Sequence, residues 1–155
     1  MAKAIVKRFS AADETRPFRG HGHVDVLKIG DGTVMRGVFE PGWKWSADVK
    51  PIAGTETCQV LHSGYVLSGR MHIVMDEGQE VDVGPGDYVL CPPGHDAWTV
   101  GDEPCVMLDV AGAGTYARAS PGAGARPAQP SAHCRAVIRP PRLNLRRGAG
   151  SLRTA

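Results

Sequence analysis

Three residue types that bind transition metals lie close together in the middle of the chain. Glu56, Cys58 and His62 all have even numbers, so in an extended strand, whose side chains alternate, they would point to one face. Further along, His95 directly follows Gly94, and a turn there could bring its imidazole to a neighbouring strand. Cys58, His62 and His95 form a ligand set suited to zinc, or to iron or nickel, with Glu56 as an optional fourth ligand.

The same residues also have ordinary structural interpretations. A buried cysteine is more often a small apolar filler, and a histidine near a strand is more often hydrogen-bonded than bound to a metal. Cys91 and Cys105 lie in apolar strand contexts, which predicts packing. His21 and His23 lie in a polar stretch, and His72 has the opposite parity to its apolar neighbours, so these three are weaker metal candidates.

All three tryptophans, Trp43, Trp45 and Trp98, lie beside these segments. Trp43 and Trp45 share parity and could line one wall of a cavity, where aromatic faces take apolar or planar ligands. Together with Trp98 they are our candidate ligand-binding residues. The alternative is that they fill the core or its rim.

The elements that must position these residues are short strands. Apolar residues alternate or cluster in runs such as 24–27, 34–39 and 71–75, and each run ends near glycine, proline or aspartate. Glycines in 30–32 and 76–78 supply the positive φ angles that hairpins require. No helical stripe is sustained over three turns. The pattern predicts an all-β antiparallel sandwich or barrel, whose closure removes exposed sheet edges.

The chain divides into an acidic body and a basic C-terminal part. Residues 1–117 contain 10 Lys+Arg and 16 Asp+Glu, whereas eight arginines and no carboxylate follow. We therefore expect a barrel domain at 1–111 and, because residues 112–155 are rich in Arg, Pro, Ala and Gly without apolar periodicity, a disordered basic tail. From Arg118 onward the tail has no aromatic residue and no lysine, which favours a solvated tail over an arm that binds nucleic acid or a membrane.

Further features bear on the compartment. No apolar stretch reaches the roughly 18 residues of a membrane-spanning helix, and residues 1–8 lack the apolar region of a signal peptide. We expect a cytoplasmic protein. The four cysteines, Cys58, Cys91, Cys105 and Cys134, are too few and too irregularly spaced for a disulfide framework or a Cys-x-x-Cys zinc site, which predicts reduced thiols.

Residues 41–109 resemble the cupin superfamily. In its second motif the family has Gly, five residues, Pro-x-Gly, two residues and His. Gly86, Pro92 and Gly94 match, whereas Ala97 occupies the histidine position. His95, two residues earlier, shares parity with Ala97 and is expected to substitute for the missing ligand.

The family's first motif reads Gly, His-x-His, three or four residues, Glu, six residues, Gly. With its last position at Gly69, His62 stands at the glutamate position, and Cys58 and Glu56 stand at the His-x-His positions. The spacing is kept and the ligand types are changed. The segments 41–46, 68–70 and 94–98 resemble a bacterial group of small single-domain cupins of undetermined activity.

The resemblance implies a double-stranded β-helix, or jelly-roll, barrel with a metal ion or a small organic ligand inside. Three functions stay open: a metal-binding or ligand-binding cupin, a metal-dependent dioxygenase, isomerase or decarboxylase acting on a small organic acid or aromatic compound, and a regulatory or structural barrel without metal. We also expect a homodimer, because cupins commonly pair through their sheets and the strand at 24–29 would need an edge partner.

Overall fold

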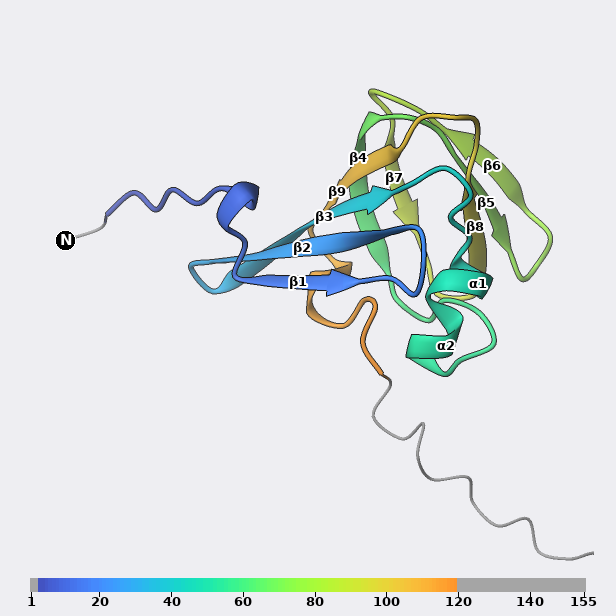
Figure 1. Ribbon diagram of the computed structural model, residues 1–155, viewed down its shortest axis with the longest axis horizontal. Helices are drawn as coiled ribbons and strands as arrows, with labels where there is room; N and C mark the ends of the chain where they lie inside the picture. The colour runs from blue at the N-terminus through green and yellow to red at the C-terminus, as the bar shows by residue number, and fades with distance from the viewer. Residues whose placement is uncertain (1–2, 120–155) are drawn as a thin grey trace, which may run out of the picture.

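The computed structural model describes residues 3–119, which form a two-sheet antiparallel β-barrel (Figure 1). The six-stranded sheet has the order β1-β2-β3-β9-β4-β7, and the three-stranded sheet has the order β6-β5-β8. The strands are β1 (Glu14–Pro17), β2 (Gly22–Ile29), β3 (Gly32–Phe39), β4 (His62–Ser68), β5 (Met71–Met75), β6 (Glu80–Val83), β7 (Tyr88–Cys91), β8 (His95–Thr99) and β9 (Cys105–Asp109). The short helices are η1 (Phe9–Ala11), α1 (Trp45–Asp48), α2 (Lys50–Ala53) and η2 (Gly112–Gly114).

The hairpin turns follow the sequence signals. Gly30, with φ 57°, lies in the turn between β2 and β3, and Gly78, with φ 89°, lies in the turn between β5 and β6. Both angles fall in the left-handed region that glycine adopts without a steric penalty. The predicted all-β architecture and the predicted runs at 24–27, 34–39 and 71–75 are confirmed.

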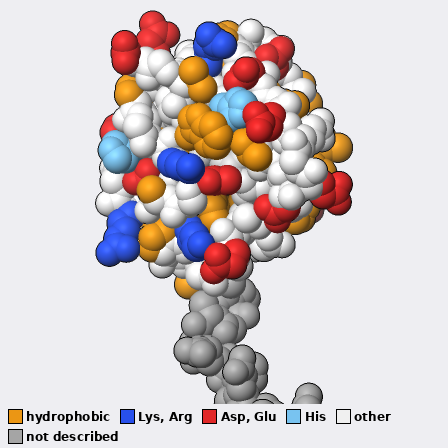
Figure 2. Space-filling view, turned by 90° about the vertical axis from the view of Figure 1, so that its right-hand side faces the viewer, with side chains coloured by type: hydrophobic (Ala, Val, Ile, Leu, Met, Phe, Trp, Pro, Cys, Tyr) orange, Lys and Arg blue, Asp and Glu red, His pale blue; other side chains and the backbone are white. Residues whose placement is uncertain are grey.

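The core lies between the two sheets. Val24 and Val66 of the large sheet and Ile73 of the small sheet are among its fully or almost fully buried side chains. Alternation along the strands places these residues inward and their neighbours outward. On the side of the molecule shown in Figure 2, side chains of both charge signs are scattered over the surface.

Two expectations about strand ends and edges are wrong. Glu56, Cys58 and His62 do not share one extended strand, since β4 begins at His62 and the backbone at Cys58 forms an isolated bridge with His95 instead of continuing β4. The strand at 24–29 is not an edge strand, since β2 pairs with both β1 and β3. The edges of the large sheet are β1 and β7.

Residues 112–119, which we call the C-terminal strap, pack against the barrel. Ala113 and Tyr116 are buried in the core. Arg16 Nη1 donates to the carbonyl oxygen of Tyr116 at 2.7 Å, and Arg118 Nη2 donates to Glu14 Oε2 at 2.6 Å. The barrel domain therefore extends beyond the expected boundary at 111, and the expected tail is wrong for 112–119. Residues 120–155, with the rest of that tail and Cys134, lie outside the described residues.

Neither α1 nor α2, each four residues long, approaches the length and apolarity of a membrane-spanning helix, and the same holds for every helix among residues 3–119.

Candidate metal centre

Three of the four predicted metal ligands converge at one end of the barrel. Cys58 lies in the loop after α2, His62 is the first residue of β4, and His95 is the first residue of β8. The Cys58 and His95 backbones are locked together, since Cys58 N–H donates to His95 O at 2.8 Å and Gly94 N–H donates to Cys58 O at 2.7 Å. One potential ligand atom from each of Cys58, His62 and His95 lies within 4.8 Å of the other two.

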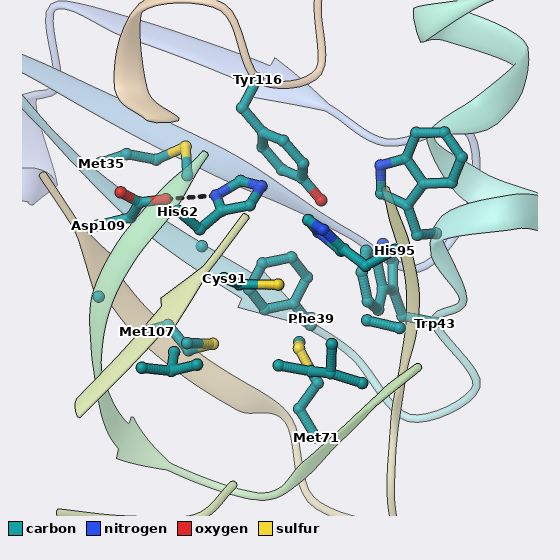
Figure 3. Close-up of a pocket in the computed structure, with 16 residues that line it drawn as sticks. Met35, Phe39, Trp43, His62, Met71, Cys91, His95, Met107, Asp109 and Tyr116 are labelled. Atoms are coloured by element: carbon teal, nitrogen blue, oxygen red, sulfur yellow. Dashed lines mark hydrogen bonds and ion pairs between the residues drawn. The ribbon is translucent and has the colours of Figure 1, made fainter. Parts of the chain in front are cut away.

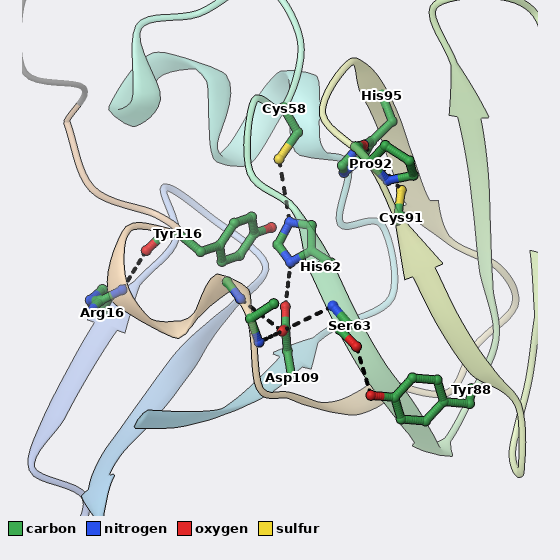
Figure 4. A network of polar contacts seen from close by, with 12 residues as sticks. Arg16, Cys58, His62, Ser63, Tyr88, Cys91, Pro92, His95, Asp109 and Tyr116 are labelled. Carbon is green, nitrogen blue, oxygen red and sulfur yellow. Dashed lines mark hydrogen bonds and ion pairs between the residues drawn. The ribbon is translucent and has the colours of Figure 1, made fainter. Parts of the chain in front are cut away.

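Both imidazoles are oriented by a hydrogen bond at Nδ1. His62 Nδ1 lies 2.5 Å from Asp109 Oδ2, and His95 Nδ1 lies 2.8 Å from the carbonyl oxygen of Pro92 (Figure 4). A carboxylate and a carbonyl only accept hydrogen bonds, so each Nδ1 carries the hydrogen and each Nε2 keeps its lone pair. His62 Nε2 lies 3.5 Å from Cys58 Sγ.

The electrostatics keep His95 neutral and Asp109 charged. Burial lowers the pKa of His95, which favours the uncharged form that binds metals. Burial by itself would raise the pKa of Asp109, but the hydrogen bond from His62 and the N–H groups of Gly112 and Ala111 outweigh it and lower the pKa. A buried carboxylate beside an imidazole is the usual support of a metal-binding histidine.

The Cys58 thiol is protonated at neutral pH. Burial raises its pKa to about 12. The indole N–H of Trp45 acts in the opposite direction and favours the thiolate, and the same buried nitrogen has no hydrogen-bond partner among the described residues. A cation that binds Cys58 must displace its proton, and the resulting thiolate would give the Trp45 N–H an acceptor.

A cavity of about 50 Å³ borders the two histidines (Figure 3). Its wall is mostly apolar and includes Met35, Phe39, Trp43, Trp45, Met71, Met107 and Tyr116. Two of the three candidate ligand-binding tryptophans thus line it. Ala97 lies in the same wall, so a methyl group occupies the position where the family motif has histidine.

Trp98 does not line this cavity, so the structure does not bring it together with Trp43 and Trp45. In β8, His95, Ala97 and Thr99 point inward, so alternation directs Trp98 to the outer face of the small sheet. There its ring lies 4.6 Å from that of His72, and Lys44 Nζ lies 5.0 Å from its centroid.

Glu56 is also not part of the cluster. Its side chain is 92% exposed and pairs with Lys50 Nζ at 2.7 Å. Sequence parity does not direct Glu56 toward Cys58 and His62, because residues 55–61 are not a strand and their side chains do not alternate.

The remaining histidines of the described chain pair with carboxylates elsewhere. His21 Nδ1 lies 3.1 Å from Asp48, His23 Nε2 lies 3.4 Å from Asp25, and His72 Nδ1 lies 2.8 Å from Asp82. Within residues 3–119, the grouping of three potential ligands is Cys58, His62 and His95. Cys91 and Cys105 are buried free thiols, as the packing interpretation predicted.

Sequence reasoning missed two residues of this site, Asp109 and Tyr116. Asp109 ends the apolar strand β9, and an acidic residue closing an apolar run was the available signal. The Tyr116 ring meets the His62 ring edge-on, with 4.8 Å between centroids and an interplanar angle of 84°. Its Gly- and Ala-rich surroundings carried no signal.

Comparison with known proteins identifies the fold. Residues 55–111 match the family model described as Cupin domain. A structural genomics protein of unknown function from Rhizobium leguminosarum has a similar structure, with a TM-score of 0.51 and 22% identity over 71% of this chain and 97% of that chain. A Cupin 2 conserved barrel domain protein from Salinispora arenicola aligns with a TM-score of 0.50 and 20% identity over 70% of this chain and 88% of that chain.

No curated protein matches the chain. At these identities the similar structures establish the fold and leave the activity to the site itself. The two antiparallel sheets, the matched segment 55–111 and these structural neighbours together show that the chain has the cupin-type double-stranded β-helix barrel fold.

Proposed function

We propose that this cupin binds one divalent transition metal ion through Cys58 Sγ and the Nε2 atoms of His62 and His95. The observation that carries the proposal is the convergence of three donors from separate segments, with both Nδ1 atoms already hydrogen-bonded. One thiolate and two imidazoles suit a borderline ion such as zinc, iron or nickel.

The donor spacing fits such an ion. With bond lengths of about 2.0–2.3 Å, two ligand atoms on a tetrahedral zinc ion lie roughly 3.3–3.6 Å apart. Cys58 Sγ and His62 Nε2 are 3.5 Å apart, and all three donors lie within 4.8 Å. Closing the set around an ion therefore needs side-chain shifts of roughly 1 Å, which rotamer adjustments provide.

The surrounding residues have defined tasks in this site. When bound, the ion supplies Lewis-acid chemistry, and three protein ligands leave one position of a tetrahedral ion open. Asp109 holds the proton on His62 Nδ1, and the Trp45 N–H supports the Cys58 thiolate. The apolar wall around Phe39 and Trp43 keeps bulk water away from the histidines.

Elemental analysis of protein purified without a metal-affinity tag tests the proposal, followed by zinc titration of chelator-treated protein. We expect one equivalent of metal in the wild type and loss of that equivalent in Cys58→Ala and in His62→Ala. His72→Ala is the matched control, because His72 also pairs with an aspartate but lies on the outer face.

Thermal denaturation of each metal-free variant shows that it is folded, and Cys58→Ser supplies a near-isosteric second variant. Occupancy should fall as the pH drops below neutrality, since protons compete for the thiolate and the imidazoles. Full metal content in the double variant Cys58→Ala, His62→Ala, or no stoichiometric ion in the wild type, would refute the proposal.

A further inference from the structure

We propose that Tyr116 and the C-terminal strap form a gate, and that a small-molecule ligand reaches the metal cluster from a recess on the outer side of this gate. The inference rests on the metal site proposed above and concerns how that site is reached. The strap and the helices α1 and α2 lie at the same end of the barrel (Figure 1), and the recess lies between them.

Two spaces meet at the cluster and share one partition. The inner cavity, about 50 Å³, is bordered by His62 and His95, whereas the outer recess, about 410 Å³, is bordered by Cys58. Trp45 and Tyr116 line both spaces. The three candidate ligands therefore lie on both sides of a partition made from these two aromatic side chains.

The inner cavity alone is too small for an organic ligand. A water needs roughly 10–15 Å³ by this measure, so about 50 Å³ accommodates only roughly three to five waters. Pockets that bind organic ligands usually measure about 300–1,000 Å³. Movement of the partition would join the cavity to the recess and give the cluster a chamber in that range.

Tyr116 is the movable part of the partition. Trp45 begins helix α1, whereas Tyr116 lies on the strap beyond the last strand. Its side chain is 3% exposed, and its ring packs on His62 and, at 6.2 Å, on Phe18. A side chain so deeply inserted from an irregular segment closes the site only while the strap stays docked.

Two arginine contacts link the strap around Tyr116 to strand β1. Arg16 binds the Tyr116 carbonyl, and Arg118, whose side chain is 51% exposed, pairs with Glu14. Between these contacts Ala117 has φ 53°, a left-handed conformation that is strained for a non-glycine residue. Undocking releases this strain, and strained residues of this kind concentrate at clamps and switches.

The rate at which iodoacetamide modifies Cys91, which lines the inner cavity, in metal-free protein, followed by peptide mass analysis, measures gate opening. Cys105 is the internal control, because burial raises the pKa of both thiols, to about 11 for Cys91 and about 12 for Cys105, and Cys105 borders neither space. The variants are Tyr116→Ala, which removes the partition, and Arg118→Ala, which removes a tether. Their controls are Tyr116→Phe and Arg19→Ala, the latter at an exposed arginine outside the strap.

We expect Tyr116→Ala and Arg118→Ala to raise the Cys91 rate about tenfold relative to Cys105, since modification of a buried thiol follows local opening. Tyr116→Phe and Arg19→Ala should leave the ratio unchanged. An unchanged ratio in both test variants, or a parallel rise at Cys91 and Cys105, would overturn the gate. Because no metal is present, a wild type that binds no ion would defeat the proposed function without altering this measurement.

Discussion

Replacing Asp109 by asparagine should weaken metal binding by reversing the tautomer of His62. Asp109 Oδ1 accepts the backbone N–H groups of Ser63, Ala111 and Gly112, at 3.3, 2.8 and 2.9 Å. These donors require an oxygen at that position, so the asparagine amide nitrogen must occupy the position of Oδ2 beside His62 Nδ1. The amide then donates to Nδ1, the ring hydrogen moves to Nε2, and the nitrogen that faces Cys58 loses its free lone pair.

The magnitude follows from the role of such supporting carboxylates. Loss of the outer partner of a metal-binding histidine costs about 10- to 100-fold in metal affinity, which is about 1.4–2.8 kcal/mol. The metal-free protein should also lose stability, by about 1–1.5 kcal/mol, because a charge-assisted hydrogen bond is replaced by a neutral one. The backbone contacts of Oδ1 are kept, so the variant should fold.

Competition with a chromophoric chelator measures the zinc affinity, and urea denaturation of the metal-free protein measures stability. Asp82→Asn is the matched control, because Asp82 makes the same type of contact to His72 Nδ1, at 2.8 Å, outside the cluster. Wild-type zinc affinity in Asp109→Asn, or equal weakening in Asp82→Asn, would refute the tautomer argument.

Three further predictions concern stability and assembly. The hydrogen bond from Arg16, followed by that from Arg118, lowers the pKa of Glu14 from 4.5 to about 2, so its contribution is present above about pH 4.5 and is lost as the pH falls toward 2. Glu14→Gln should cost about 0.5–1 kcal/mol at pH 7, and urea denaturation should show no difference from the wild type near pH 2. A chain ending at residue 111 loses the buried Tyr116 and should be less stable than one ending at 119 by about 3–5 kcal/mol; equal urea midpoints would show that the strap is not part of the core. Tyr88 and Leu90 are 63% and 65% exposed on edge strand β7, which predicts a homodimer across this edge. Light scattering should give twice 16.5 kDa for the wild type and the monomer mass for Leu90→Glu. A monomer mass for the wild type at all concentrations would contradict the predicted dimer.

The sequence by itself determined the strands and the turns between them. Alternation in runs such as 71–75 and left-handed glycines such as Gly30 act over a few residues, so their effect can be read without knowing the partner strands. It also placed His95 correctly, since parity within β8 directs both His95 and Ala97 inward. For the same local reason, parity should have directed Trp98 outward, and the position of Trp98 beside the motif was misleading.

Only the tertiary structure decided which residues complete the site. Glu56 leaves the cluster because the loop at 55–61 follows the backbone bridge between Cys58 and His95 instead of a strand. Asp109 enters it because β9 pairs with β4 in a register that sets Asp109 opposite Gly64, two residues from His62. Tyr116 enters because the strap docks through contacts to Arg16, 100 residues away in sequence. These positions depend on strand register and on packing between distant segments, and no local pattern in the chain encodes them.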